Sequence, residues 1–229
     1  GSTELRYAWA AMYRSVHGVE LDPENQVMPV LGSKEGIFHL ALAYIEPGDI
    51  VLAPDPGYIT YTRGAWMAGG EIYPMPLLPE AGFLPNLAAI PSDVLQRAKL
   101  LWLNYPSNPT AAVASPDFLA QAVDFARQHN LLLCHDAAYT RVTYDGYRAP
   151  SILEIPGAHE VAVEFNTLSK SHNMAGWRTG ALLGNAEVVR TFHRLKTNVD
   201  SGHFLPIMDA SMAALNGDQS WLVDRNAIY

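Results

Sequence analysis

The sequence predicts an α/β fold in which helices cover both faces of a mostly parallel, seven-stranded sheet. Short runs rich in Val, Ile and Leu alternate with longer helical patterns along the whole chain. Several of these apolar runs are continuous rather than alternating, which indicates strands that are buried on both faces. Turn signals such as Pro47-Gly48-Asp49 and Ala68-Gly69-Gly70 separate the elements.

Seven apolar runs have the length and composition of strands. They are expected near Val27 to Leu31, Asp49 to Ala53, Glu71 to Pro76, Lys99 to Asn104, Leu131 to His135, Val161 to Asn166 and Thr179 to Leu183. Helical patterns run from Glu4 to Val16, Lys34 to Ile45, Tyr58 to Ala68, Ser115 to His129, Glu187 to Asn198 and Gln219 to Tyr229. Ser115 followed by Pro116 is a typical helix start. Gly1-Ser2-Thr3 could be a cloning scar, or Ser2 or Thr3 could cap the first helix.

Composition narrows the class of protein. The 229 residues are 49% hydrophobic and 17% charged, which suits one compact domain with a substantial core. The formal net charge of -8, without a basic stripe, argues against a nucleic-acid partner. No long apolar run or signal-peptide pattern is found, so no membrane partner is expected. The only cysteine, Cys134, lies in an apolar run, which excludes a disulfide framework and predicts a reducing, cytoplasmic location.

Polar motifs follow the predicted strands, where an open α/β sheet binds its ligands. Gly32 to Gly36 joins a strand to a helix start, where free backbone N–H groups favour an anion such as phosphate. Its alternative interpretation is an ordinary turn capped by Ser33. Asp55-Pro56-Gly57-Tyr58 places Tyr58 at the next helix start, where its ring could stack on a planar ligand or simply pack in the core.

Two further motifs carry an amide, a carboxylate and a phenol. The proline-bounded segment Asn104 to Thr110 could direct the Asn108 amide toward a ligand, although Asn-Pro is also a common turn. Cys134 to Tyr139 brings Asp136 out of a buried strand and places Tyr139 three residues later. His135 beside Asp136 suggests a metal, but no second ligand follows at helical spacing, so no metal site is expected.

The last motif runs from Thr167 to Arg178 and contains Lys170 between hydroxyls and a glycine. Either Ser169 or Ser171 could be a nucleophile activated by Lys170, or Lys170 could form a Schiff base with a cofactor aldehyde. The five motifs together fit pyridoxal phosphate better than a peptide substrate. They offer a binding site for phosphate, an aromatic ring for stacking, an aspartate for a ring nitrogen, a phenol and a lysine.

Taken together, in this order and at these spacings, the five motifs resemble the class I/II, fold-type I aminotransferases. The resemblance covers nearly the whole chain and is strongest to the branch that contains LL-diaminopimelate and aspartate aminotransferases. It implies a pyridoxal 5'-phosphate cofactor and transfer of an amino group from an amino acid to a 2-oxo acid.

The resemblance also implies a role for each residue. Lys170 would form the Schiff base, Asp136 would pair with the pyridine nitrogen, and Tyr139 would act with them in catalysis. Tyr139 and Asn108 would contact the phenolic oxygen, with Asn108 also near the substrate, and Tyr58 would stack on the ring. The positions around the phosphate would be Ser33, Lys34, Thr167, Ser169 and Arg178.

The chain departs from the family pattern at its ends. No match is found for the small-domain arginine that grips the substrate carboxylate, nor for the tyrosine that reaches across the dimer. Arg225 lies too early and in the wrong element for the former, and Ala111 stands where the family usually has glycine. We therefore expect residues 1–229 to be the cofactor-binding large domain, ending within a helix that leads to a small domain, and the full-length form to be a homodimer.

Two alternatives use the same residues. C–S lyases and decarboxylases of this fold share the lysine and the aspartate but direct the reaction differently. A non-catalytic domain that senses the cofactor in a transcriptional regulator is the second alternative, although no helix-turn-helix pattern is found.

Overall fold

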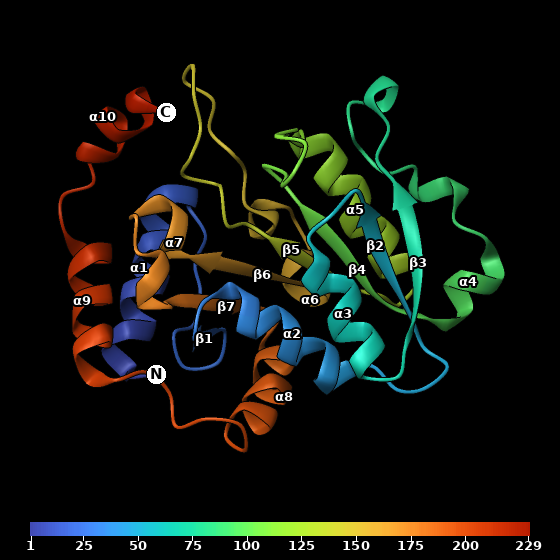
Figure 1. The fold of residues 1–229 in the computed structure, drawn as a ribbon, viewed down its shortest axis with the longest axis horizontal. Helices are drawn as coiled ribbons and strands as arrows, with labels where there is room; N and C mark the ends of the chain where they lie inside the picture. Colours follow the sequence, from blue (N-terminus) through green and yellow to red (C-terminus); the bar gives the residue numbers. More distant parts are fainter.

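The computed structural model describes residues 1–229 as one seven-stranded sheet between two layers of helices (Figure 1). The strands are β1 (Val27–Val30), β2 (Ile50–Asp55), β3 (Glu71–Pro76), β4 (Ala98–Asn104), β5 (Leu132–Asp136), β6 (Ala162–Thr167) and β7 (Gly180–Gly184). Each predicted strand is confirmed to within a few residues, and so is the fold class.

The strand order is β1-β7-β6-β5-β4-β2-β3. All neighbours from β3 to β6 pair in parallel, whereas β7 runs antiparallel to both β6 and β1. In the parallel part, Asn104 pairs with Asp136, and Asp136 pairs with Phe165. The carboxyl ends of β4, β5 and β6 therefore meet at one edge of the sheet, which is the edge where a ligand site is expected.

Helices make up the outer layers. They are α1 (Thr3–His17), α2 (Ser33–Tyr44), α3 (Ile59–Met67), α4 (Ser92–Arg97), α5 (Pro116–Gln128), α6 (Ala158–Val161), α7 (Leu168–Ser171), α8 (Ala186–Lys196), α9 (Leu205–Asn216) and α10 (Trp221–Ile228). All six predicted helices are present. The predicted caps are also confirmed, since Ser2 Oγ accepts from the Leu5 N–H and Ser115 Oγ from the Phe118 N–H, both at 3.2 Å.

Two apolar clusters hold the layers together. One contains residues of α1, α5 and α9, and the other contains residues of α2, α3 and α8. Successive residues of β4 enter opposite clusters, so that Leu101 lies in the first and Trp102 in the second. Because the sheet is buried on both faces, its strands are continuous apolar runs. None of the helices is both long and apolar enough to span a membrane.

Helix α9 was not predicted. Leu205, Met208 and Met212 have helical spacing, but Ile207 and several alanines make the other faces apolar too, so no contrast between an apolar and a polar face marks the helix. The helix nevertheless packs along α1 at the end of the sheet (Figure 1). Pro206 in its first turn is a helix-start signal that could have found it.

Candidate active site

A cavity of about 470 Å³ opens beyond the carboxyl ends of β4, β5 and β6. Every site residue predicted from the sequence lies on its wall. These residues are Ser33, Lys34, Tyr58, Asn108, Asp136, Tyr139, Thr167, Ser169, Lys170 and Arg178. The remaining wall residues, Asn104, Ala138 and Ala175, come from the same segments. The fold therefore brings together five motifs that are far apart in the sequence.

Asp136 ends β5 and is only 5% exposed. Its Oδ2 accepts a hydrogen bond from the Tyr61 hydroxyl at 2.7 Å, whereas its Oδ1 is buried and has no partner in the chain. Burial raises the pKa of Asp136, and the hydrogen bond from Tyr61 opposes that rise. A buried carboxylate oxygen without a donor is costly, so a ligand with an N–H group in the cavity would satisfy it.

Tyr61 was not predicted as a site residue. It lies one helical turn after Tyr58 on α3 and is 1% exposed. Its ring stacks on Trp102 with centroids 4.7 Å apart. Burial raises its pKa well above 10, so the hydroxyl stays protonated and donates to Asp136. The i, i+3 spacing from Tyr58 on a helix that faces the site is the signal that could have identified it.

The loop before α2 forms a cup for an anion. Gly32 is the N-terminal cap with φ of 81°, and Ser33 begins the helix. The alternative interpretation, a turn capped by Ser33, is therefore wrong. A Cβ at Gly32 would stand 2.3 Å from Nη2 of Arg178, so only glycine lets this guanidinium approach the loop. Backbone N–H groups at the start of a helix and a guanidinium are a typical phosphate-binding pair.

The charges around the cavity favour an anionic ligand. Lys34, Lys170 and Arg178 line it, and none of the three forms an ion pair with a carboxylate. Arg178 has φ of 55°, and its Nη1 donates to the Ala175 carbonyl at 2.9 Å. Asp136 is the only carboxylate on the wall. Three cations against one acid give the cavity a net positive charge.

Lys170 lies on the single-turn helix α7, which follows β6 directly. Thr167 begins this turn, because its Oγ1 accepts from the Ser169 N–H at 3.1 Å and donates to the Thr179 carbonyl at 2.9 Å. The side chain of Lys170 is exposed to the cavity, and its Nζ lies 5.7 Å from the centroid of the Tyr139 ring. The amine is therefore free to react with a ligand.

Tyr139 and Asn108 approach the cavity on two loops that Asn104 connects. Asn104 Nδ2 donates to the Asp136 carbonyl at 2.8 Å, and Asn104 Oδ1 accepts from the Asn108 N–H at 2.7 Å. Asn104 belongs to the predicted motif from Asn104 to Thr110, but the sequence did not identify it as a site residue. Burial first, and the charge of Asp136 second, raise the pKa of Tyr139, which keeps its hydroxyl available as a donor.

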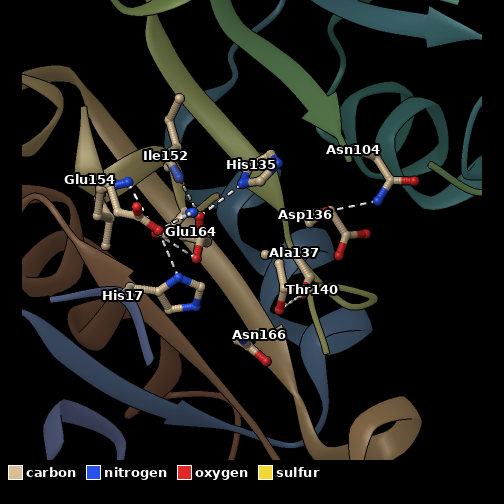
Figure 2. Close-up of polar contacts among 12 residues, drawn as sticks. His17, Asn104, His135, Asp136, Ala137, Thr140, Ile152, Glu154, Glu164 and Asn166 are labelled. Atoms are coloured by element: carbon tan, nitrogen blue, oxygen red, sulfur yellow. Dashed lines mark hydrogen bonds and ion pairs between the residues drawn. The ribbon is translucent and has the colours of Figure 1, made fainter. Parts of the chain in front are cut away.

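A buried polar network lies behind Asp136 and explains the role of His135 (Figure 2). His135 Nδ1 lies 2.8 Å from Glu164 Oε2, and both side chains are fully buried. Glu164 also accepts from the hydroxyls of Tyr13 and Ser151 and from the Ile152 N–H. His135 and Asp136 are consecutive in a strand and point to opposite faces. His135 therefore fixes β5 against β6 while Asp136 faces the cavity.

Burial alone would raise the pKa of Glu164, but the hydrogen bond and charge of His135 outweigh it, so that the pKa is lowered. The carboxylate is therefore held in its charged form behind the site. No cluster of three or more His, Cys, Asp or Glu side chains is placed to hold a metal ion.

Comparisons of sequence and of structure with known proteins all identify aminotransferases. The model of the aminotransferase class I and II family matches residues 1–228. An LL-diaminopimelate aminotransferase of Moorella thermoacetica is 52% identical over all 229 residues, which span 59% of that relative's length. The substrate-bound BacF structure from Bacillus subtilis superposes with a TM-score of 0.97 at 40% identity, covering the whole chain and 58% of BacF.

A probable N-succinyldiaminopimelate aminotransferase from Thermus thermophilus superposes with a TM-score of 0.94 at 36% identity. That match covers 99% of this chain and 61% of the solved one. The chain thus spans about three fifths of the proteins it matches. It belongs to the class I and II aminotransferase family.

Proposed function

We propose that the protein is a pyridoxal-phosphate-dependent aminotransferase that moves an amino group from an amino acid to a 2-oxo acid. The observation that carries the proposal is the pairing, in one cavity, of an accessible Lys170 amine with the unpartnered Oδ1 of buried Asp136. A protein that bound only a phosphate would need neither group. When bound, the cofactor would supply an aldehyde that reacts with amines and a protonated ring that withdraws electrons.

The residues present fit this cofactor. Oδ1 of Asp136 would accept from the ring N–H, and the negative charge of Asp136 would keep that nitrogen protonated. Tyr58, half-buried on the wall, would stack on the ring. The phenolic oxygen would accept hydrogen bonds from Tyr139 and Asn108. Asn108 would also lie beside the substrate.

The phosphate would bind at the positively charged end of the cavity. Its ligands would be the N–H groups at the start of α2 and the side chains of Ser33, Lys34, Thr167, Ser169 and Arg178. Lys170 would hold the cofactor covalently in the resting protein. Once an amino acid displaces it, Lys170 Nζ would take the proton from the substrate α-carbon as a general base and would then donate it, as a general acid, to the carbon that the lysine had occupied.

The names of the relatives direct the choice of amino donor. At 52% identity to an LL-diaminopimelate aminotransferase, LL-diaminopimelate is the first donor to test, with a panel of 2-oxo acids as acceptors. We also propose that the active form is a homodimer. The side chains of Ile59, Trp66 and Met67 on α3 are exposed around Arg63, and a second copy could cover this mixed surface. Buried, unpaired Cys134 supports a reducing, cytoplasmic location.

Borohydride reduction of the protein loaded with pyridoxal phosphate tests the proposal. Peptide mass spectrometry should find the reduced pyridoxyl group on Lys170, and Lys170→Ala should lose both the adduct and keto-acid production. An adduct on another lysine would overturn the assignment. Product analysis then distinguishes amino transfer from release of sulfide or carbon dioxide by the same residues.

A further inference from the structure

The side chain of Arg225 on α10 is only 6% exposed, yet it forms no ion pair with a carboxylate. Burying a guanidinium without a counter-ion is unfavourable unless its N–H groups find strong acceptors. Its Cζ lies 5.9 Å from the ring centroids of both Trp221 and Tyr229. The rings of Trp221, at the start of α10, and Tyr229, directly after its end, thus flank the guanidinium, and its N–H groups need hydrogen-bond acceptors.

Its acceptors are the side-chain oxygen Oδ1 of Asn226, which accepts from Nε and Nη2, and backbone carbonyls on the two loops that carry reactive side chains. Arg225 Nη1 donates to the carbonyl of Lys170 at 2.7 Å and also to that of Ser171. Arg225 Nη2 donates to the carbonyl of Arg141 at 2.8 Å. One guanidinium therefore connects the segment of Lys170 with the segment that follows Tyr139.

The contact with α7 has a clear physical reason. The helix is a single turn, Leu168–Ser171, so its last carbonyl groups have no partners within the helix. A positive side chain at this end satisfies those carbonyls and opposes the negative end of the helix dipole. Without it, the turn that presents Lys170 would keep its Thr167 cap and the hydrogen bond from the His172 N–H to the Leu168 carbonyl, but the carbonyls of Lys170 and Ser171 would lose this donor.

Neighbouring residues of the same segment strengthen the connection. Asn226 Nδ2 donates to the carbonyls of Arg141 and Thr143 at 3.2 and 3.1 Å. Gln219 Oε1 accepts from Arg141 Nη1 at 2.9 Å and lies 3.1 Å from His172 Nε2. The segment from Gln219 to Asn226 thus contacts both loops from the side away from their reactive groups.

We propose that Arg225 is a positioning residue that sets the distance between Lys170 and Tyr139 by binding the backbone of both loops. Arg225 does not line the cavity and touches no reacting atom. The proposal rests on the proposed function only in assigning reactive roles to Lys170 and Tyr139; the contacts themselves exist in the chain without a ligand.

The first test is hydrogen exchange of the cofactor-free, full-length protein carrying Arg225→Gln. Peptides covering residues 168–174 and 139–144 should exchange about tenfold faster, because the lost hydrogen bonds weaken local structure. Peptides covering β4 and β6 should be unchanged. Arg194→Gln is the matched control, since Arg194 is exposed on α8 and its side chain makes no hydrogen bond. Unchanged exchange at both loops in Arg225→Gln would overturn the proposal.

Arg225→Lys keeps the charge but cannot reach three carbonyls in the same fixed geometry. It should loosen the same two segments less than Arg225→Gln, and it decides the question if the glutamine variant does not fold. Wild-type exchange at both loops in Arg225→Lys would then count against the proposal.

The second readout is the rate at which pyridoxal phosphate and borohydride label Lys170. The rate should fall about tenfold in Arg225→Gln, since a small displacement of the amine slows reaction strongly. An undisturbed labelling rate, with faster loop exchange, would also overturn the positioning role. If wild-type label appears on a lysine other than Lys170, the proposed function fails, whereas the exchange results still test the contacts of Arg225 separately.

Discussion

The hydroxyl of Tyr61 donates to Oδ2 of Asp136, while Oδ1 of the same buried carboxylate has no partner. One oxygen is thus used to fix the carboxylate, and the other is left for a ligand. The stacking of Tyr61 on Trp102 holds the donor in place. Tyr61 on α3 therefore sets the orientation of Asp136, the residue proposed to pair with the nitrogen of the cofactor ring.

Tyr61→Phe should destabilise the protein by about 1–3 kcal/mol, because it leaves Oδ2 of Asp136 buried without a donor. The ring stacking is retained, so the fold should persist. The pKa of Asp136 should rise further, since the Tyr61 hydrogen bond lowers it. Equilibrium unfolding in urea measures the stability.

Tyr105→Phe is the control, because that hydroxyl donates to the Phe83 carbonyl away from the cavity. Only Tyr61→Phe should also lose affinity for pyridoxal phosphate, and equal losses of affinity in the two variants would contradict a specific role for Tyr61.

Asp136→Asn should preserve the fold and most of the cofactor affinity. It should slow the reaction with an amino acid by about two orders of magnitude or more, because the charge that stabilises a protonated ring nitrogen is removed with little change in shape. Single-turnover absorbance with LL-diaminopimelate measures the rate. A rate close to that of the wild type would show that Asp136 is a structural carboxylate.

Gly32→Ala should weaken binding of pyridoxal phosphate by about 10- to 100-fold. The new Cβ would stand 2.3 Å from Nη2 of Arg178 and displace a charge-assisted hydrogen-bond donor. Fluorescence titration measures the affinity. Gly146→Ala is matched in backbone strain, since Gly146 has φ of 73°, but its Cβ would meet nothing within 4 Å. Both variants should lose stability, and only Gly32→Ala should lose affinity.

Glu154→Gln should remove a stabilising contribution that depends on pH. Burial alone would raise the pKa of Glu154, but hydrogen bonds from Arg148, the Ser151 N–H and His17 lower it to about 2 from 4.5. Because the folded-state pKa lies below the unfolded one, the contribution is complete above pH 4.5 and is lost as pH falls toward 2. Urea unfolding at several pH values should show the variant's deficit shrinking across this window. Glu80→Gln, on the exposed surface, should show no such trend.

The strands and the cavity wall were predictable because both depend on local sequence. Runs such as Lys99 to Asn104 are apolar on both faces, and the polar residue that ends each run must lie at the sheet edge. Tyr61, Asn104 and Arg225 were missed as functional residues for a different reason. Each acts through a partner distant in the sequence: Tyr61 through Asp136, Asn104 through the Asp136 and Asn108 backbones, and Arg225 through two loops. The i, i+3 spacing from Tyr58 could have placed Tyr61 on the side of α3 that faces the site, but no local pattern in the sequence shows which distant partner a side chain will contact.

The antiparallel direction of β7 allows one segment to be exchanged as a unit. Thr167 and Gly180 are paired across β6 and β7, so the chain leaves the sheet and returns to it at the same edge. Lys170 and Arg178 both lie within this excursion. A loop of different length or composition could therefore be grafted between the paired residues, provided that it keeps Leu168 and Met174, which pack in the core, and the carbonyls that Arg225 binds. Variant libraries confined to this stretch would change the spacing between the Lys170 amine and the Arg178 guanidinium while the rest of the sheet stayed constant. This stretch is therefore the place to begin when altering the preference for cofactor or amino donor.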